Sequence, residues 1–251
     1  MGGENYYLIT ALPVWGELGS APPMTRAAFL EHLAPSPAAR EQAEAIFLAD
    51  DLLQREAVLS GQLDEPDPAV LSDGQVRGEA PLPDTLATAT PEGSGDRVLT
   101  DAIWEAYFRH AARVADRRGS RFLRAWVGVE VGLRNALVEA RAKALQLDAA
   151  LYAVATDLAG EDEYDEIVSQ WSAAGDPLAG LLALDAARWK WLDAHDGRFS
   201  FADDELAAYA ARLTLLHRWH RLEAEQERIR QGGADEEIAS PAGRNGNEAE
   251  Q

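Results

Sequence analysis

The chain has 251 residues, no cysteine and a formal net charge of -20. Its length suits one or two domains, and an apolar fraction of 47% is typical of a globular protein. The acidity argues against general nucleic-acid binding, the lack of cysteine excludes disulfides and thiolate metal sites, and no apolar run is long enough for membrane insertion.

The first sixty residues (1–60) predict an extended N-terminal segment and then a helical lobe. Tyrosine, isoleucine and threonine in residues 5–13 favour extended structure. Thr25 is placed to cap a short helix over 26–33. Ser36, which a proline follows, is placed to cap a longer helix that runs to the end of this lobe.

Residues 61–97 differ in composition from the segments on either side. They are polar and acidic, and five prolines and several glycines interrupt them. We interpret this stretch as a mobile connector with one short helix near 68–73. It would separate the N-terminal lobe from a C-terminal helical domain.

Residues 98–231 predict that helical domain. Thr100 is placed to cap its first helix, which ends at Gly119, and Ser120 starts a long helix with an apolar seam. Further helices are expected at 148–159, 162–173, 177–194 and 202–231. The Gly-rich tail, residues 232–251, predicts disorder. The whole pattern predicts an all-α, multi-helix bundle-like body.

The known motifs for nucleotide binding and nucleophilic catalysis are absent from the sequence, so we assign no catalytic or cofactor-binding residue. His217 and His220 stand three residues apart on the last predicted helix, with Glu223 three further on. That spacing can place imidazoles on one face, as a metal site requires. Packed or surface histidines explain the pattern better, because the sequence places no further ligand beside them.

Charged and indole side chains gather on two predicted helices. Glu130 precedes Arg134 by four residues, and Asp185 precedes Arg188 by three. We expect Arg134, Asp185 and Arg188 to form a partly buried polar cluster between these helices, although a partner-binding rim would use the same residue types. The structural or partner-binding candidates are Glu130, Arg134, Asp185, Arg188, Trp189 and Trp219.

Several motifs, taken in order, resemble those of a bacterial family of unknown function whose genes lie beside those of V-type ATP synthases. The Asn-Tyr-Tyr-Leu-Ile-Thr-Ala-Leu-Pro start at 5–13 resembles the family's N-terminus. Matching segments follow at 133–137, 141–142, 184–189, 192–193 and within 209–223. The chain departs from the family at 226–229, where a glycine and an aromatic residue are usual.

This family is distantly similar to the C-type subunit of V/A-type ATPases, which is the d-type subunit of the eukaryotic enzymes. The resemblance implies an all-helical, funnel-like, non-catalytic component that joins the central-axle subunits to the proteolipid ring. It also implies a peripheral position on the cytoplasmic face of the membrane, held by protein contacts, and no cofactor. The N-terminus lacks the pattern of a signal peptide, which agrees with a cytoplasmic protein. The alternative is a cytosolic helical enzyme or metal-binding protein that uses His217, His220 and nearby carboxylates.

Overall fold

The computed structural model describes residues 4–87 and 99–239, and within these ranges the protein is entirely helical, with no β-strand. The all-α prediction is therefore confirmed. The helices are α1 (Glu4–Thr10), α2 (Arg26–His32), α3 (Pro37–Leu59), α4 (Asp73–Val76), α5 (Leu99–Arg118), α6 (Arg121–Leu145), α7 (Asp165–Ser172), α8 (Pro177–His195) and α9 (Asp203–Ala239), with 3-10 turns at Ala149–Leu151 and Thr156–Leu158.

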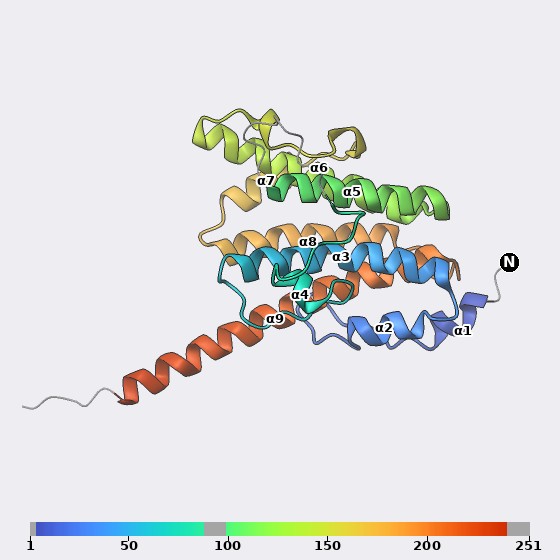
Figure 1. Ribbon diagram of the computed structural model, residues 1–251, viewed down its shortest axis with the longest axis horizontal. Coiled ribbons are helices and arrows are strands. Elements are labelled where there is room, and N and C mark those ends of the chain that lie inside the picture. The colour runs from blue at the N-terminus through green and yellow to red at the C-terminus, as the bar shows by residue number, and fades with distance from the viewer. Residues whose placement is uncertain (1–3, 88–98, 240–251) are drawn as a thin grey trace, which may run out of the picture.

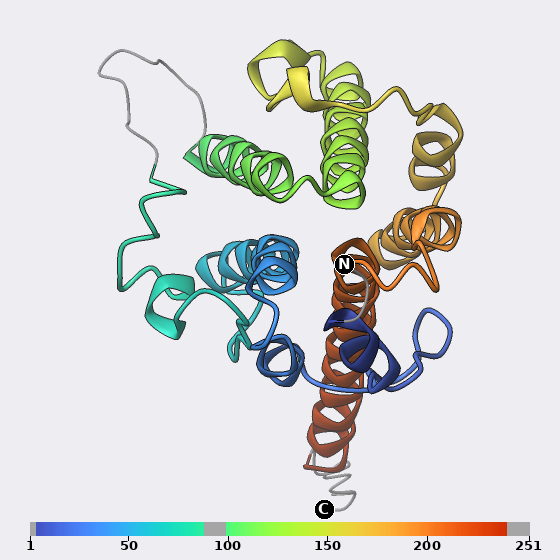
Figure 2. The same cartoon turned by 90° about the vertical axis from the view of Figure 1, so that its right-hand side faces the viewer.

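Helices α3 and α9 pack along each other at the centre of the body (Figure 1). Helix α5 packs on α3 and α6, while α8 lies between α9 and α7. All side chains of residues 206–217 in α9 are buried, as expected of a helix with neighbours on every side. One hydrophobic core joins the segments before and after residues 61–97. Seen along the long axis, α3, α5, α6, α8 and α9 stand around a common centre (Figure 2).

Two of the predicted helix starts are confirmed by their hydrogen bonds. The Ala28 amide donates to Thr25 Oγ1 at 3.1 Å, and the Leu123 amide donates to Ser120 Oγ at 3.0 Å. Ser36 precedes α3 as predicted but makes no side-chain cap bond. The prediction for Thr100 is wrong, because α5 already includes it.

The N-terminal segment was expected to be extended, and this is wrong for residues 4–10, which form α1. Tertiary contacts outweigh the strand propensity of these residues. Asn5 Nδ2 donates to Asp203 Oδ1 at 2.8 Å, and His32 Nε2 lies 2.7 Å from the Leu8 carbonyl oxygen. The helix is thereby attached to both α9 and α2.

Residues 61–87 of the predicted connector are packed against α3. Asp51 accepts hydrogen bonds from the amides of Ala69, Val70 and Leu71 at 2.7–3.1 Å, and its carboxylate organises that turn. The side chains of Leu71, Val76 and Leu86 are buried. The short helix predicted near 68–73 instead occupies α4, where a capping box starts it. Residues 88–97 lie outside the described ranges.

The helix predicted at 148–159 is wrong, since only two 3-10 turns form there. Gln146 ends α6 in the left-handed region at φ 57°, and Ala155 adopts φ 45° between the turns. The Asn135 side chain holds this irregular backbone, because its amide bonds both the carbonyl and the N–H of Val154 at 2.9 and 3.0 Å. A side-chain clamp of this kind replaces helical hydrogen bonds.

The predicted helices at 162–173, 177–194 and 202–231 correspond to α7, α8 and α9. Helix α9 continues to Ala239, so the prediction of a disordered tail is wrong for residues 232–239. Residues 240–251 lie outside the described ranges. Within the part of the chain that the structure describes, no helix has both the length and the apolar character that crossing a bilayer demands.

Candidate functional site

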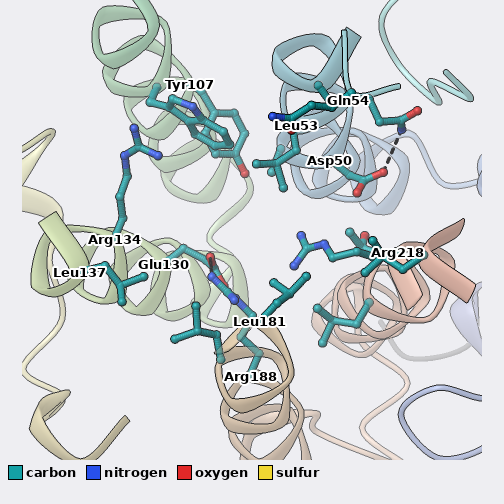
Figure 3. A pocket seen from close by; sticks show the side chains of 18 of the residues that line it. Asp50, Leu53, Gln54, Tyr107, Glu130, Arg134, Leu137, Leu181, Arg188 and Arg218 are labelled. Carbon is teal, nitrogen blue, oxygen red and sulfur yellow. Dashed lines mark hydrogen bonds and ion pairs between the residues drawn. The ribbon is translucent and has the colours of Figure 1, made fainter. Parts of the chain in front are cut away.

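Five helices (α3, α5, α6, α8 and α9) enclose a cavity of about 820 Å³ (Figure 3). Lining residues at one end, among them Ile46, Trp126 and Ala211, are buried. At the other end Leu145 is 68% exposed and Leu147 is 50% exposed. The cavity is therefore closed at the Trp126 end and opens to solvent at the Leu145 end, which we call the mouth.

A buried ion-pair cluster borders the closed half of the cavity. Arg188 on α8 donates Nε and Nη2 to the two carboxylate oxygens of Glu130 on α6, at 2.7 and 3.0 Å. Its Nη1 donates to Asp185 at 2.9 Å. Asp185 is fully buried and also accepts from Arg218 Nη1 at 2.9 Å and from Trp219 Nε1 at 3.1 Å. The cluster thus ties α6, α8 and α9 together.

Four of the six candidate residues from the sequence meet in this cluster: Glu130, Asp185, Arg188 and Trp219. The expected place of Arg134 is wrong, because its Nη2 donates to Asp101 on α5 at 3.0 Å and its guanidinium lies 4.9 Å from the Trp104 ring centroid. Arg134 lies one helical turn after Glu130 on α6. Helix α5 packs beside the turn that carries Arg134, whereas α8 packs beside the turn that carries Glu130. Trp189 lies apart, with its ring 5.0 Å from the guanidinium of Arg212.

Burial and neighbouring charges fix the protonation of the groups around the cavity. Burial alone would lower the pKa of Arg188, but Glu130 and Asp185 outweigh it and raise that pKa above its usual value. Burial, with the Glu130 charge as a smaller cause, raises the pKa of Tyr107 well above its usual range. Tyr107 therefore stays protonated and remains a hydrogen-bond donor at neutral pH.

A second buried cluster, which the sequence analysis missed, surrounds Asp50 on α3. Arg26 on α2 forms an ion pair with this carboxylate, and Arg221 on α9 forms a second one through Nη2 at 2.7 Å. Gln54 Nε2 also donates to it, at 3.0 Å. Burial alone would raise the pKa of Asp50, but Arg221 and Arg26 outweigh it and lower the pKa to about 2. One sequence feature could have indicated this cluster: Asp50 and Asp51 stand side by side within an otherwise apolar stretch of α3.

The two histidines of the alternative prediction do not converge. His217 Nε2 lies 2.9 Å from the Met24 carbonyl oxygen, and burial lowers the pKa of this histidine. His220 is exposed. Across residues 4–87 and 99–239, no group of three or more His, Cys, Asp or Glu side chains has a metal-binding arrangement.

Exposed aromatic side chains gather where α9 begins. Phe199 is 81% exposed and Tyr7 is 77% exposed, and the Tyr6 ring lies 5.2 Å from that of Phe201. Phe199 and Phe201 have φ values of 65° and 53°, a costly region for aromatic residues. Both oxygens of Glu205 hold this loop, accepting from the Phe199 amide at 3.1 Å and the Phe201 amide at 2.9 Å. We call Tyr6, Tyr7 and Phe199 the aromatic end.

The opposite end of α9 projects from the body beyond the other helices (Figure 1). Near the start of this projection, Glu225 and Arg228 form an exposed ion pair at 2.6 Å. A helix of 37 residues is about 55 Å long at 1.5 Å per residue, so the projecting end lies far from the aromatic end. One continuous helix connects them.

Comparison with models of known protein families, with curated proteins and with solved structures finds no match to this chain. The cavity, the two ion-pair clusters and the two ends of α9 are therefore interpreted from their own chemistry.

Proposed function

We propose that this protein is a non-catalytic coupling component of a V/A-type rotary ATPase, similar in role to the C-type subunit of these enzymes. It would join the central-axle subunits to the proteolipid ring on the cytoplasmic face of the membrane. The proposal rests on the ordered sequence motifs described above. Among the structural observations, the two dissimilar ends of α9 support it most.

A coupling component needs two separate binding surfaces and a stiff connection between them. The aromatic end offers exposed rings, which are typical of residues that dominate protein interfaces. Where the projecting end begins, Glu223, Glu227 and Arg228 are exposed charged side chains, which suit a second helix with complementary charges. The segment between them is buried on every side, and close packing of this kind resists deformation under load.

The decisive experiment is purification of a tagged copy from the native membrane fraction. We expect the axle subunits and the proteolipid ring to be recovered together with it. Recovery of neither, while the rest of the ATPase stays assembled, would refute the proposal and favour the enzyme alternative.

A variant of the aromatic end makes this experiment sharper. Phe199→Asn removes an exposed ring, and asparagine tolerates the left-handed backbone at this position. We expect the variant to fold normally and to lose one of the two partners while it keeps the other. Leu182→Asn, at a residue that is 48% exposed on α8, is the matched control and should keep both.

A further inference from the structure

We propose that the cavity binds a single-chain anionic amphiphile of the fatty-acid class. The carboxylate would lie near Tyr107 and Arg218, and the hydrocarbon chain would extend toward the mouth. This inference concerns a ligand of the cavity and does not depend on the proposed ATPase role.

The cavity is elongated and open at one end, which suits a chain molecule. Its lining on α6 runs from Trp126 to Leu145, a distance of about 28 Å at 1.5 Å per residue. The exposed fraction of the side chain rises along this path from 7% at Trp126 to 68% at Leu145. A volume of about 820 Å³ lies within the usual range of ligand pockets, roughly 300–1,000 Å³.

The closed half of the cavity carries polar groups that could hold a head group. Figure 3 shows the Tyr107 hydroxyl and the Arg218 guanidinium directed toward the centre from opposite sides. Tyr107 is 3% exposed, and its hydroxyl has no hydrogen-bond partner among the described residues. Arg218 donates one bond, to Asp185, and its other N–H groups have no described acceptor.

Among the described residues that line the cavity, the buried side-chain polar atoms without a hydrogen-bond partner are all donors, and the Tyr107 hydroxyl can donate as well. Besides Tyr107, the buried atoms Arg134 Nε and Arg221 Nη1 have no hydrogen-bond partner among the described residues. The buried carboxylates beside them, Asp50 and Asp185, already accept from arginines. A ligand that supplies acceptors would therefore satisfy these donors. Charge-assisted bonds to a carboxylate are also the stronger kind.

The other half of the cavity offers an apolar wall for a hydrocarbon chain, and the exposed charged residues Glu65, Arg141 and Arg228 also line the cavity near the mouth. Leu137 and Leu181 line it beyond the polar groups, and Leu53, Leu145 and Leu147 continue the apolar surface to the mouth. The path from the Arg134 position to the mouth is about 17 Å along α6, long enough for the chain of a common fatty acid. Each buried methylene would add to the affinity.

The test is displacement of the fluorescent fatty acid cis-parinaric acid from the full chain by palmitate. We expect saturable binding of the probe and full displacement by palmitate. Tyr107→Phe should weaken palmitate binding about tenfold, as expected for loss of a hydrogen bond to a charged group. Tyr164→Phe, which removes a hydroxyl from a residue that does not line the cavity, should leave it unchanged. Leu137→Trp should abolish binding by filling the chain path.

Further ligands separate the head group from the chain and identify the source of the ligand. Hexadecanol should bind more weakly than palmitate, and hexadecylamine should not bind. Lysophosphatidylcholine, whose head group is too bulky for the closed half, should fail to displace the probe, and displacement by it would assign the site to membrane lipid instead. Equal affinity for palmitate and hexadecylamine would overturn the inference, as would palmitate binding that survives Leu137→Trp. Leu181→Trp serves the same purpose if the first tryptophan variant does not fold.

Discussion

Asp185 is a fully buried carboxylate whose acceptors are occupied by Arg188, Arg218 and Trp219. Asp185→Ala would leave two buried guanidinium groups short of a counter-charge. We expect the free energy of unfolding, measured in urea, to fall by about 3–5 kcal/mol, the usual cost of breaking a buried pair.

The control for this prediction is an ion pair on the surface. Arg124 and Asp116 lie 2.6 Å apart, and both side chains are more than half exposed. Asp116→Ala should change the free energy of unfolding by less than about 1 kcal/mol, because solvent screens such pairs. A loss for Asp185→Ala as small as that for Asp116→Ala would show that the buried cluster is not structural.

Asp50 should make the stability of the protein depend on pH in the acid range. Its pKa is about 2 in the folded protein, against a usual 3.8, because Arg221 and Arg26 outweigh the effect of burial. The unfolded chain therefore takes up the proton first as the pH falls. The stabilisation, about 2 kcal/mol, is present above about pH 5 and is lost as the pH falls toward 2.

Urea unfolding at a series of pH values measures this contribution. Asp50→Asn should lower stability at pH 7 and flatten the decline between about pH 5 and pH 2. Asp84→Asn, at an exposed side chain outside the Asp50 cluster, is the control and should keep the decline. Asp51 has the opposite effect on the pH dependence, because burial raises its pKa. The contribution of Asp51 to folding stability therefore diminishes as the pH rises. An unchanged acid decline in Asp50→Asn would contradict the assignment.

At the scale of elements, helical periodicity in the sequence predicted the long helices correctly. Local propensity gave the wrong secondary structure where contacts with distant residues determine the conformation. Residues 4–10 favour strands, yet α1 forms because Asn5 and Leu8 bond to other helices. The 148–159 segment has a helical composition, yet the Asn135 clamp and a left-handed Ala155 interrupt it. Bonds between residues far apart in the chain leave no trace in a local pattern.

The same limit applies to the candidate site. The pairing of Arg188 with Glu130 followed from two helices that each carry charge beside an apolar seam. The partner of Arg134 could not be predicted in this way. Whether Arg134 pairs with Asp101 or with Asp185 depends on which helix packs against its turn of α6. The Asp50 cluster was missed because Arg26 and Arg221 lie 24 and 171 residues away from it.

Gly132 on α6 marks a close approach to the segment that follows this helix. A Cβ atom there would lie 2.4 Å from the Tyr164 hydroxyl oxygen, which donates to the Val129 carbonyl at 3.3 Å. Gly132→Ala gains about 1 kcal/mol in helix propensity but must displace the Tyr164 ring. We expect a net loss of about 1–2 kcal/mol in the free energy of unfolding from the overpacking.

A double mutant separates the clash from other effects of the substitution. If the tyrosine ring is the obstacle, Tyr164→Ala should remove the penalty of Gly132→Ala, so the two changes are not additive. Gly175→Ala is the control, because a Cβ at that position meets nothing within 4 Å. Additive losses at Gly132 and Tyr164 would show that the helix surface adapts without the ring moving.

At the scale of the whole molecule, α9 is a single helix with two different environments. Residues 206–217 are surrounded by the other elements, whereas the C-terminal part projects from the body (Figure 1). Burial of the first part supplies the packing that holds the other helices. The second part begins with exposed charged side chains such as Glu223 and Arg228, and an exposed charged helix adds little to folding stability.

Shortening the chain after Arg228 tests this division of roles. The cut keeps every α9 residue that lines the cavity and removes the end of the projection. We expect the free energy of unfolding to change by less than about 0.5 kcal/mol, because this end of α9 projects from the body (Figure 1). Palmitate binding should also persist, because the cavity stays whole.

Recovery of one ATPase partner from native membranes should fail, and the Phe199→Asn variant should lose the other. If the shortened chain retains both partners, the projecting helix is not a coupling surface. If instead it unfolds at lower urea concentration, the projection contributes to the fold, and its exposure cannot be taken as evidence of a binding role.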